Sequence, residues 1–74
     1  MIVVTLQGGT VQLLREEDGF VQAILQDDQG KALTSHRFQA GSQSPDTLVE
    51  LLGLEEQNDP DLVELGTVLD RFAA

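Results

Sequence analysis

Hydrophobic and polar residues alternate through the first half of the chain, whereas hydrophobic residues recur at helical spacing in the second half. Residues 2–6 and 10–14 are rich in β-branched and aliphatic side chains and flank the sequence Gln7-Gly8-Gly9. Adjacent glycines are typical of tight hairpin turns, because glycine reaches positive φ without a steric cost. The pattern therefore predicts a β-hairpin over residues 2–14.

Another apolar run, residues 20–26, follows the charged turn at residues 15–19. Its length and composition predict a third strand. A short helix is the alternative interpretation, because Val21, Ile24 and Leu25 also have i, i+3, i+4 spacing and Asp18 is placed to cap such a helix.

The turn sequence Asp27-Asp28-Gln29-Gly30 precedes a fourth run, residues 31–38, in which side chains alternate between two faces. One face would carry Ala32, Thr34, His36 and Phe38. Both faces have mixed polarity, and Lys31 and Arg37 discourage pairing with a further strand. This run is therefore predicted to be an edge strand.

Two helix starts follow. Ser44-Pro45-Asp46 and Asn58-Asp59-Pro60 each combine a capping side chain with a proline and an acidic residue suited to the first turn. They predict helices over residues 45–52 and 60–72, and Gly53 with Leu54 predicts a left-handed C-cap after the first.

Strands followed by helices indicate the α+β class. We expect one domain over residues 1–74, an antiparallel meander of three to four strands with two C-terminal helices packed on one face. The predicted core consists of Val4, Leu6, Val11, Leu13, Leu48, Leu52, Leu62, Leu65, Leu69 and Phe72.

The 74 residues are 41% hydrophobic, which suffices for a single core, and include no cysteine. Absence of cysteine favours a reducing cytoplasm over an oxidising compartment. The N-terminus has no basic segment before an apolar core, so we expect no signal peptide. Apolar runs stay far below the roughly 20 residues that span a bilayer, and we expect a cytoplasmic protein with no membrane contact.

The net charge of −9 argues against nucleic-acid binding, which depends on clustered Lys and Arg. Only four residues are basic, namely Arg15, Lys31, Arg37 and Arg71. Eight of the thirteen acidic residues lie between Asp46 and Asp70, where basic residues are absent.

Residue types for catalysis or cofactor binding do not form a recognisable motif. His36 is the only imidazole, and its neighbour Ser35 would point to the opposite face of the strand. Asp59, Asp61 and Glu64 lack the spacing of a calcium loop, and Gly8-Gly9 precedes neither a lysine nor a helix. We therefore predict no catalytic residue, metal or cofactor, and a protein that is not an enzyme.

The acidic second half is the remaining candidate for function. Helix capping accounts for Asp46, Asp59 and Asp61. Four of the acids without such a duty form the candidate interface for a protein partner with a basic surface, namely Glu50, Glu55, Glu56 and Glu64. Simple solubility is one alternative reason for this charge. An alternative function is that of a small-molecule-binding or accessory subunit of a larger complex, with a groove between the sheet and the second helix near Gly66.

The stretch from Glu16 to Leu52 combines an acidic Asp-Gly turn, two strands joined by a turn, and a Ser-Pro-Asp-x-Leu helix start. This order resembles the HicB-type antitoxin domain and covers about half of the chain. The resemblance implies a β-β-β-α core that binds a small basic toxin. This sequence departs from that family at residues 26–30, where Gln-Asp-Asp-Gln-Gly stands in place of the family's Leu-Pro-Gly segment.

Overall fold

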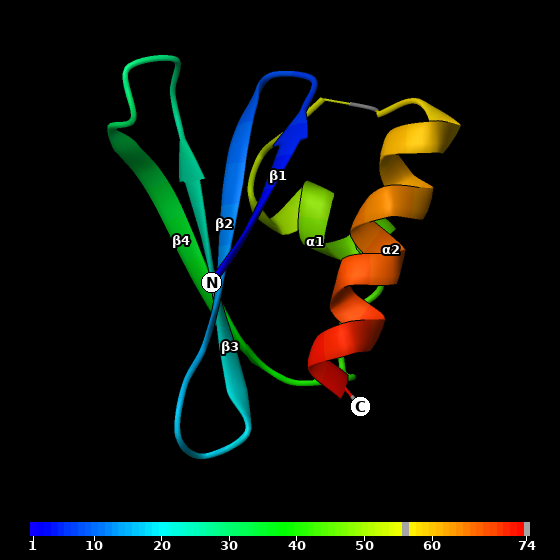
Figure 1. The fold of residues 1–74 in the computed structure, drawn as a ribbon. Helices are drawn as coiled ribbons and strands as arrows, with labels where there is room; N and C mark the ends of the chain where they lie inside the picture. Colours follow the sequence, from blue (N-terminus) through cyan, green and yellow to red (C-terminus); the bar gives the residue numbers. More distant parts are fainter. Residues whose placement is uncertain (56, 74) are drawn as a thin grey trace.

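The computed structural model describes residues 1–55 and 57–73, which form a sheet followed by two helices. The strands are β1 (Ile2–Leu6), β2 (Gly9–Arg15), β3 (Phe20–Gln26) and β4 (Ala32–Gln39), and the helices are α1 (Pro45–Leu51) and α2 (Asp59–Ala73). Each strand pairs antiparallel with its neighbour in sequence, in the order β1-β2-β3-β4. The expected α+β meander is confirmed (Figure 1).

The β1–β2 hairpin turns through Gln7 and Gly8 alone, because Leu6 pairs with Gly9. Gly8 has a φ of +99°, which other residues rarely adopt. Gly9 is already a strand residue, and a Cβ atom there would come within 2.7 Å of Leu25 Cδ1. The two glycines therefore have different roles: the first turns the chain, and the second leaves room for β3.

Residues 20–26 form a strand, so the helical alternative is wrong. Val21 pairs with Arg15 on β2 and with Phe38 on β4, which provides backbone partners on both sides. Val21, Ala23 and Leu25 are buried and the residues between them are not, a period of two that a helix does not produce. Strand pairing on both sides outweighed the local helical spacing.

Both helices begin with the expected N-caps, and α1 also ends with the expected C-cap. The Ser44 hydroxyl accepts the Thr47 N–H at 3.3 Å, and Asn58 Oδ1 accepts the Asp61 N–H at 3.0 Å. After α1, Gly53 has a φ of +76°. The Gly53 N–H donates to the Glu50 carbonyl at 3.0 Å, and the Leu54 N–H donates to the Val49 carbonyl at 3.1 Å. This pair of hydrogen bonds is a Schellman motif, which confirms the predicted C-cap.

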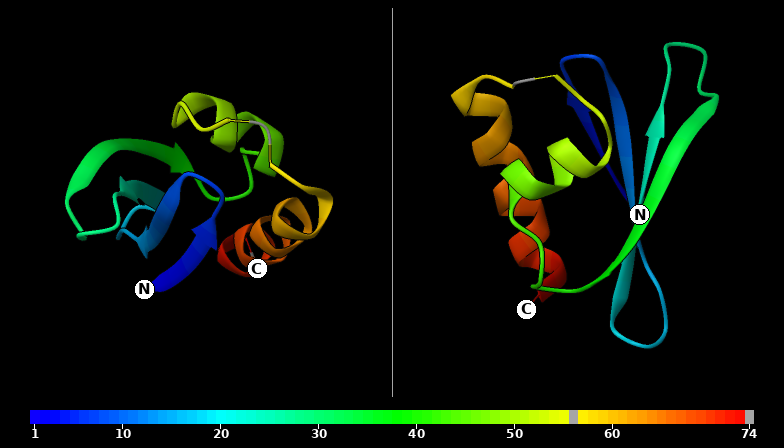
Figure 2. Two further views of the ribbon diagram at one scale, coloured as in Figure 1. Left: turned by 90° about the horizontal axis from the view of Figure 1, so that it is seen from above. Right: turned by 180° about the vertical axis from the view of Figure 1, so that it is seen from behind.

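Both helices lie on one side of the sheet, which gives the two layers seen in Figure 2. The buried hydrophobic residues are Val4, Leu6, Val11, Leu13, Val21, Ala23, Leu25, Phe38, Leu48, Val49, Leu52, Leu65, Val68, Leu69 and Phe72. All predicted core residues except Leu62 are among them. Leu62 is partly buried at the margin of the core.

Leu51, at the end of α1, is apolar but 49% exposed. The helix has only seven residues, and Leu48, Val49 and the C-cap Leu52 already occupy the side that meets the sheet. β4 is an edge strand as predicted, and its residues 32–35 are exposed.

Candidate functional site

A groove runs between α1 and α2 on the outside of the helical layer. It consists of two adjoining hollows of about 420 Å³ and 580 Å³, which share Asp46, Asp59 and Leu62. Gly66 brings the helices close together, since a Cβ atom there would lie 3.1 Å from Pro45 Cγ. The small residue therefore lets the start of α1 approach the middle of α2. We call these two hollows the helix groove.

The helix groove combines apolar lining residues with a series of carboxylates. Its apolar side chains are Pro45, Val49, Leu54, Leu62 and Val63. Its acidic side chains are Asp46, Glu50, Glu55, Asp59 and Asp70. The described lining residues include no Lys, Arg or His. Such a surface has a strongly negative potential beside an apolar contact area.

Gln57 fixes one end of the groove to the sheet. It is a buried polar residue at 6% exposure, and its side-chain Oε1 accepts the Gln7 N–H at 2.8 Å. Its Nε2 donates to the carbonyls of Gln7 at 2.6 Å and Glu55 at 3.0 Å. Leu54, which lines the groove, also lies against the hairpin turn, because a Cβ atom on Gly8 would be 3.3 Å from Leu54 Cδ2. The loop after α1 is thus held by the tip of the β1–β2 hairpin.

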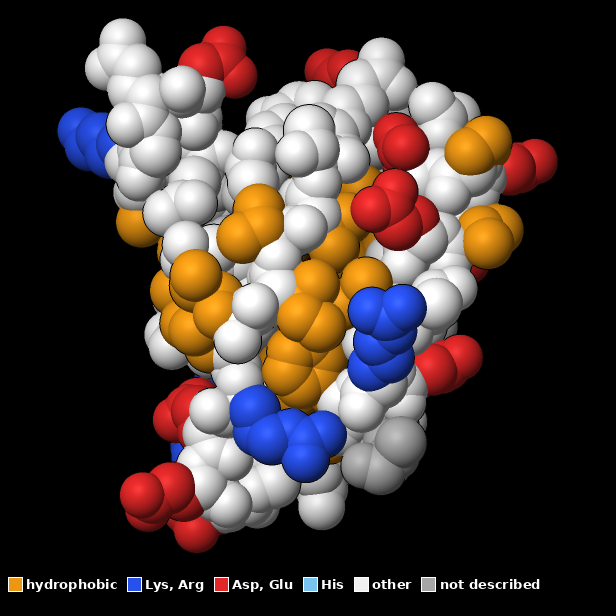
Figure 3. Space-filling view, in the orientation of Figure 1, with side chains coloured by type: hydrophobic (Ala, Val, Ile, Leu, Met, Phe, Trp, Pro, Cys, Tyr) orange, Lys and Arg blue, Asp and Glu red, His pale blue; other side chains and the backbone are white. Residues whose placement is uncertain are grey.

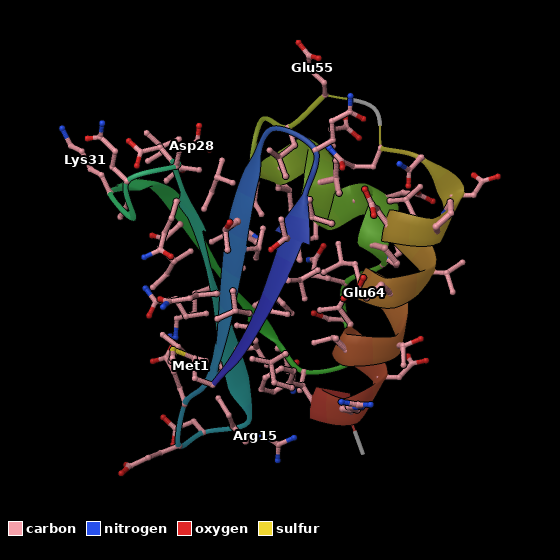
Figure 4. All side chains as sticks on the ribbon, turned by 45° about the horizontal axis from the view of Figure 1, so that its top comes forward. Met1, Arg15, Asp28, Lys31, Glu55 and Glu64 are labelled. Carbon is pink, nitrogen blue, oxygen red and sulfur yellow. The ribbon has the colours of Figure 1, made fainter. Side chains whose placement is uncertain are left out.

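The structure divides the four predicted interface residues. Glu50 and Glu55 line the groove, whereas Glu64 is exposed on α2 outside the set of lining residues. Figure 4 labels Glu55 in the connection between the helices and Glu64 on α2. On a helix, the side-chain directions of two residues that are two positions apart differ by about 200°. Glu64 therefore lies on nearly the opposite side of α2 from Gly66. Glu56 lies outside the described residues.

Three groove carboxylates were missed by sequence reasoning. Asp46 and Asp59 were set aside as first-turn acids, and both do lie in the first turn of their helices, but both also line the groove. Asp70 lies one helical turn beyond Gly66, and both line the second hollow. The glycine was the usable signal, because a glycine within a helix indicates a close approach.

The chemistry outside the groove is dispersed. His36 is on β4, with its ring centre 6.0 Å from that of Phe38. Arg15 donates to the Phe72 carbonyl and lies over the Phe72 ring, which ties β2 to the end of α2. In the part of the chain that the structure describes, His, Asp and Glu side chains do not gather in groups of three or more that could hold a metal ion.

Neither α1 nor α2, within the described residues, is long and apolar enough to cross a membrane. Comparisons of the chain with protein-family models, with curated protein sequences and with solved structures find no match.

Proposed function

We propose that this chain is a non-enzymatic cytoplasmic binding module, and that its helix groove receives a basic segment of a partner protein. The observation that carries this proposal is the lining of the groove. Taken together, the two hollows place five carboxylates around apolar side chains. Complementary charge directs the approach and the register of a partner, while buried apolar contacts stabilise the complex.

The partner segment should carry both lysine or arginine and at least one apolar anchor. Val49, Leu54 and Leu62 offer the anchor a contact area in the first hollow. Glu50 and Glu55, in the same hollow, offer partners for its basic side chains. A purely basic segment would leave the apolar lining unused, and a purely apolar one would leave the carboxylates facing a desolvated surface.

A non-enzymatic role is proposed because the hydroxyl among the described lining residues of the groove, that of Thr67, donates to the Val63 carbonyl at 3.0 Å within α2. Nucleophilic catalysis by a hydroxyl requires a base that activates it. His36, on the edge strand β4, is outside the groove lining.

A comparison of two doubly substituted variants with equal charge tests the proposal. Glu50→Gln/Glu55→Gln removes two groove carboxylates, and Glu17→Gln/Glu64→Gln removes two exposed carboxylates elsewhere, so each variant changes the net charge from −9 to −7. Immobilised wild-type protein and both variants are incubated with native lysate at low salt, and retained proteins are quantified by mass spectrometry. We expect the groove variant to retain its specific partner about tenfold less than wild type and the control variant to retain it normally.

Binding should also weaken as salt is added, because screening reduces the attraction between opposite charges. Equal losses in both variants would indicate attraction to net charge alone, and no loss in the groove variant would place the interface elsewhere. A small basic toxin as the retained protein would support the HicB-like alternative.

The hollow beside Gly66 favours a second candidate, a small-molecule site. Its volume of about 580 Å³ is within the range of ligand pockets, although it lies between the two helices and not between α2 and the sheet. A library of cationic metabolites screened by NMR tests this candidate. Saturable shifts of the Gly66 amide would support it, and unchanged spectra would argue for a protein partner.

A further inference from the structure

One face of α2 lines both hollows of the helix groove. The lining residues that α2 contributes are Asp59, Leu62, Val63, Gly66, Thr67 and Asp70. They follow one another at steps of three and one positions in turn, which places them on a single side of the helix, here called the groove stripe. Asp59 and Asp70 lie at its two ends, roughly 16 Å apart at the helical rise of about 1.5 Å per residue.

The groove stripe is distinct from the side of α2 that packs on the core, whose buried residues are Leu65, Val68, Leu69 and Phe72. Val63, near the middle of the groove stripe, is 68% exposed, and its neighbour Leu62 is only partly buried. At the right of Figure 3, over α2, hydrophobic side chains are exposed between carboxylates. An amphipathic surface helix normally has polar residues on the side away from the core. α2 therefore presents apolar surface on a second side, bordered by acidic residues.

α1 and the loop after it form the other wall of the groove. From α1 the lining residues are Pro45, Asp46, Val49 and Glu50. The described lining residues of both hollows all come from position 45 or later, so none of them belongs to a strand. Within each helix the backbone N–H and C=O groups of the interior turns pair with one another. The groove therefore offers apolar and acidic side chains to a partner, but no sheet edge with which an extended chain could pair.

We propose that the basic segment received by the helix groove is an amphipathic α-helix of about three turns that lies along the groove stripe. This inference rests on the function proposed above and specifies its partner. An extended segment would leave backbone N–H and C=O groups unpaired against Leu62 and Val63, which is costly. A helix pairs these groups within itself, and it places apolar side chains at i, i+3, i+4 and i+7 on one side to contact the groove.

The positions of the carboxylates specify the charge pattern of the partner helix. Glu50 and Glu55 lie in the first hollow, Asp70 lies in the second, and Asp46 and Asp59 line both. Basic side chains are therefore expected on both sides of the apolar positions of the partner, with more of them toward the first hollow. A neutral helix would desolvate these carboxylates without compensation, and an acidic helix would be repelled by them.

Two synthetic peptides test the helical form of the partner. The first is an alanine-rich peptide of about 16 residues, with leucines at i, i+3, i+4 and i+7 and lysines at both ends on the same side. The second has the same leucines and lysines, but a proline replaces a central alanine and breaks the helix. Each peptide is titrated into the isotope-labelled full chain and followed by NMR, up to about 1 mM peptide so that weak binding is measured. We expect the first peptide to bind with shifts at the groove stripe, and the proline peptide to bind about 100-fold more weakly.

Two matched pairs of substitutions test whether the peptide follows the groove stripe. Asp70→Asn and Glu64→Gln each remove one exposed carboxylate from α2, the first inside the groove stripe and the second outside it. Asp70→Asn should weaken binding of the first peptide about threefold, and Glu64→Gln should leave it unchanged. Val63→Thr and Val3→Thr each place a hydroxyl on an exposed valine, in the groove stripe and on β1 respectively. Val63→Thr should weaken binding about fivefold, and Val3→Thr should have no effect.

The outcomes separate this inference from the proposed function. Equal binding of the two peptides would overturn the helical partner. So would a loss of binding in Glu50→Gln/Glu55→Gln without any loss in Asp70→Asn and Val63→Thr, although a shorter basic segment in the first hollow would then still fit. Equal losses in Asp70→Asn and Glu64→Gln would indicate attraction to net charge alone and overturn both proposals. If neither peptide binds, the helical partner is overturned, and the lysate experiment decides the proposed function by itself.

Discussion

Replacing Leu65 with alanine should remove a large part of the stability of this domain. Leu65 is completely buried where α2 meets the sheet. Loss of three carbon atoms forfeits about 2.4 kcal/mol at roughly 0.8 kcal/mol per methylene. The cavity left behind adds to this loss, and we expect a total of about 3 to 4 kcal/mol. A domain of 74 residues has an unfolding free energy of roughly 4 to 11 kcal/mol.

Urea unfolding followed by far-UV circular dichroism is the appropriate assay, because the chain contains neither tryptophan nor tyrosine for fluorescence. The midpoint should fall while the slope m stays constant, since the surface exposed on unfolding hardly changes. The melting temperature should fall by at least about 12 °C. Protein concentration is kept equal for all variants, because any association of folded molecules stabilises the folded state by mass action.

Val63→Ala is the matched control, since Val63 is in the same helix but 68% exposed. It should change the unfolding free energy by less than about 0.5 kcal/mol. If Leu65→Ala is equally mild, α2 does not dock on the sheet through this side chain, and the arrangement of the helix groove must be different.

Three further substitutions test local features. Gln57→Ala should lower the unfolding free energy measured in urea by about 1 to 3 kcal/mol, because it removes the hydrogen bonds to Gln7. Hydrogen exchange of the Gln7 amide should become faster, and an unchanged exchange rate would contradict this role. Gly53→Ala should cost about 1 to 2 kcal/mol because φ is +76°, and an unchanged melting temperature would contradict it. Arg37→Ala and Glu16→Ala, analysed as a double-mutant cycle, should give a coupling below about 1 kcal/mol because the pair is exposed, and a larger value would indicate burial.

The sequence predicts the elements of this fold well because its local signals agree with one another. Ser44 and Asn58 cap the helices where expected, and Gly53 ends α1. Residues 20–26 were ambiguous because the spacing of Val21, Ile24 and Leu25 suits both a helix and a strand. Only the neighbouring strands on both sides decide between them, and that pairing is a non-local property.

The candidate site could be predicted only in part. Glu50 and Glu55 were identified from charge and position, but Asp46, Asp59 and Asp70 line the groove through the way two helices pack. That packing depends on the contact between Gly66 and Pro45, which are far apart in the sequence and belong to different helices. The helical spacing within one element says nothing about the residues that a second element brings beside it.

The packing of α2 on β1 determines the order in which this protein can fold. Each hairpin of the sheet joins its two strands through a short turn, at residues 7–8, 16–19 and 27–31. Closing such short loops costs little chain entropy. α2 instead joins the last part of the described chain to the first, and it brings Leu65, Leu69 and Phe72 onto the core. Contacts between distant segments form slowly. During synthesis, the apolar side of the completed sheet can therefore be covered only in part, by α1, until α2 has emerged, and in this interval the nascent chain is most exposed to aggregation.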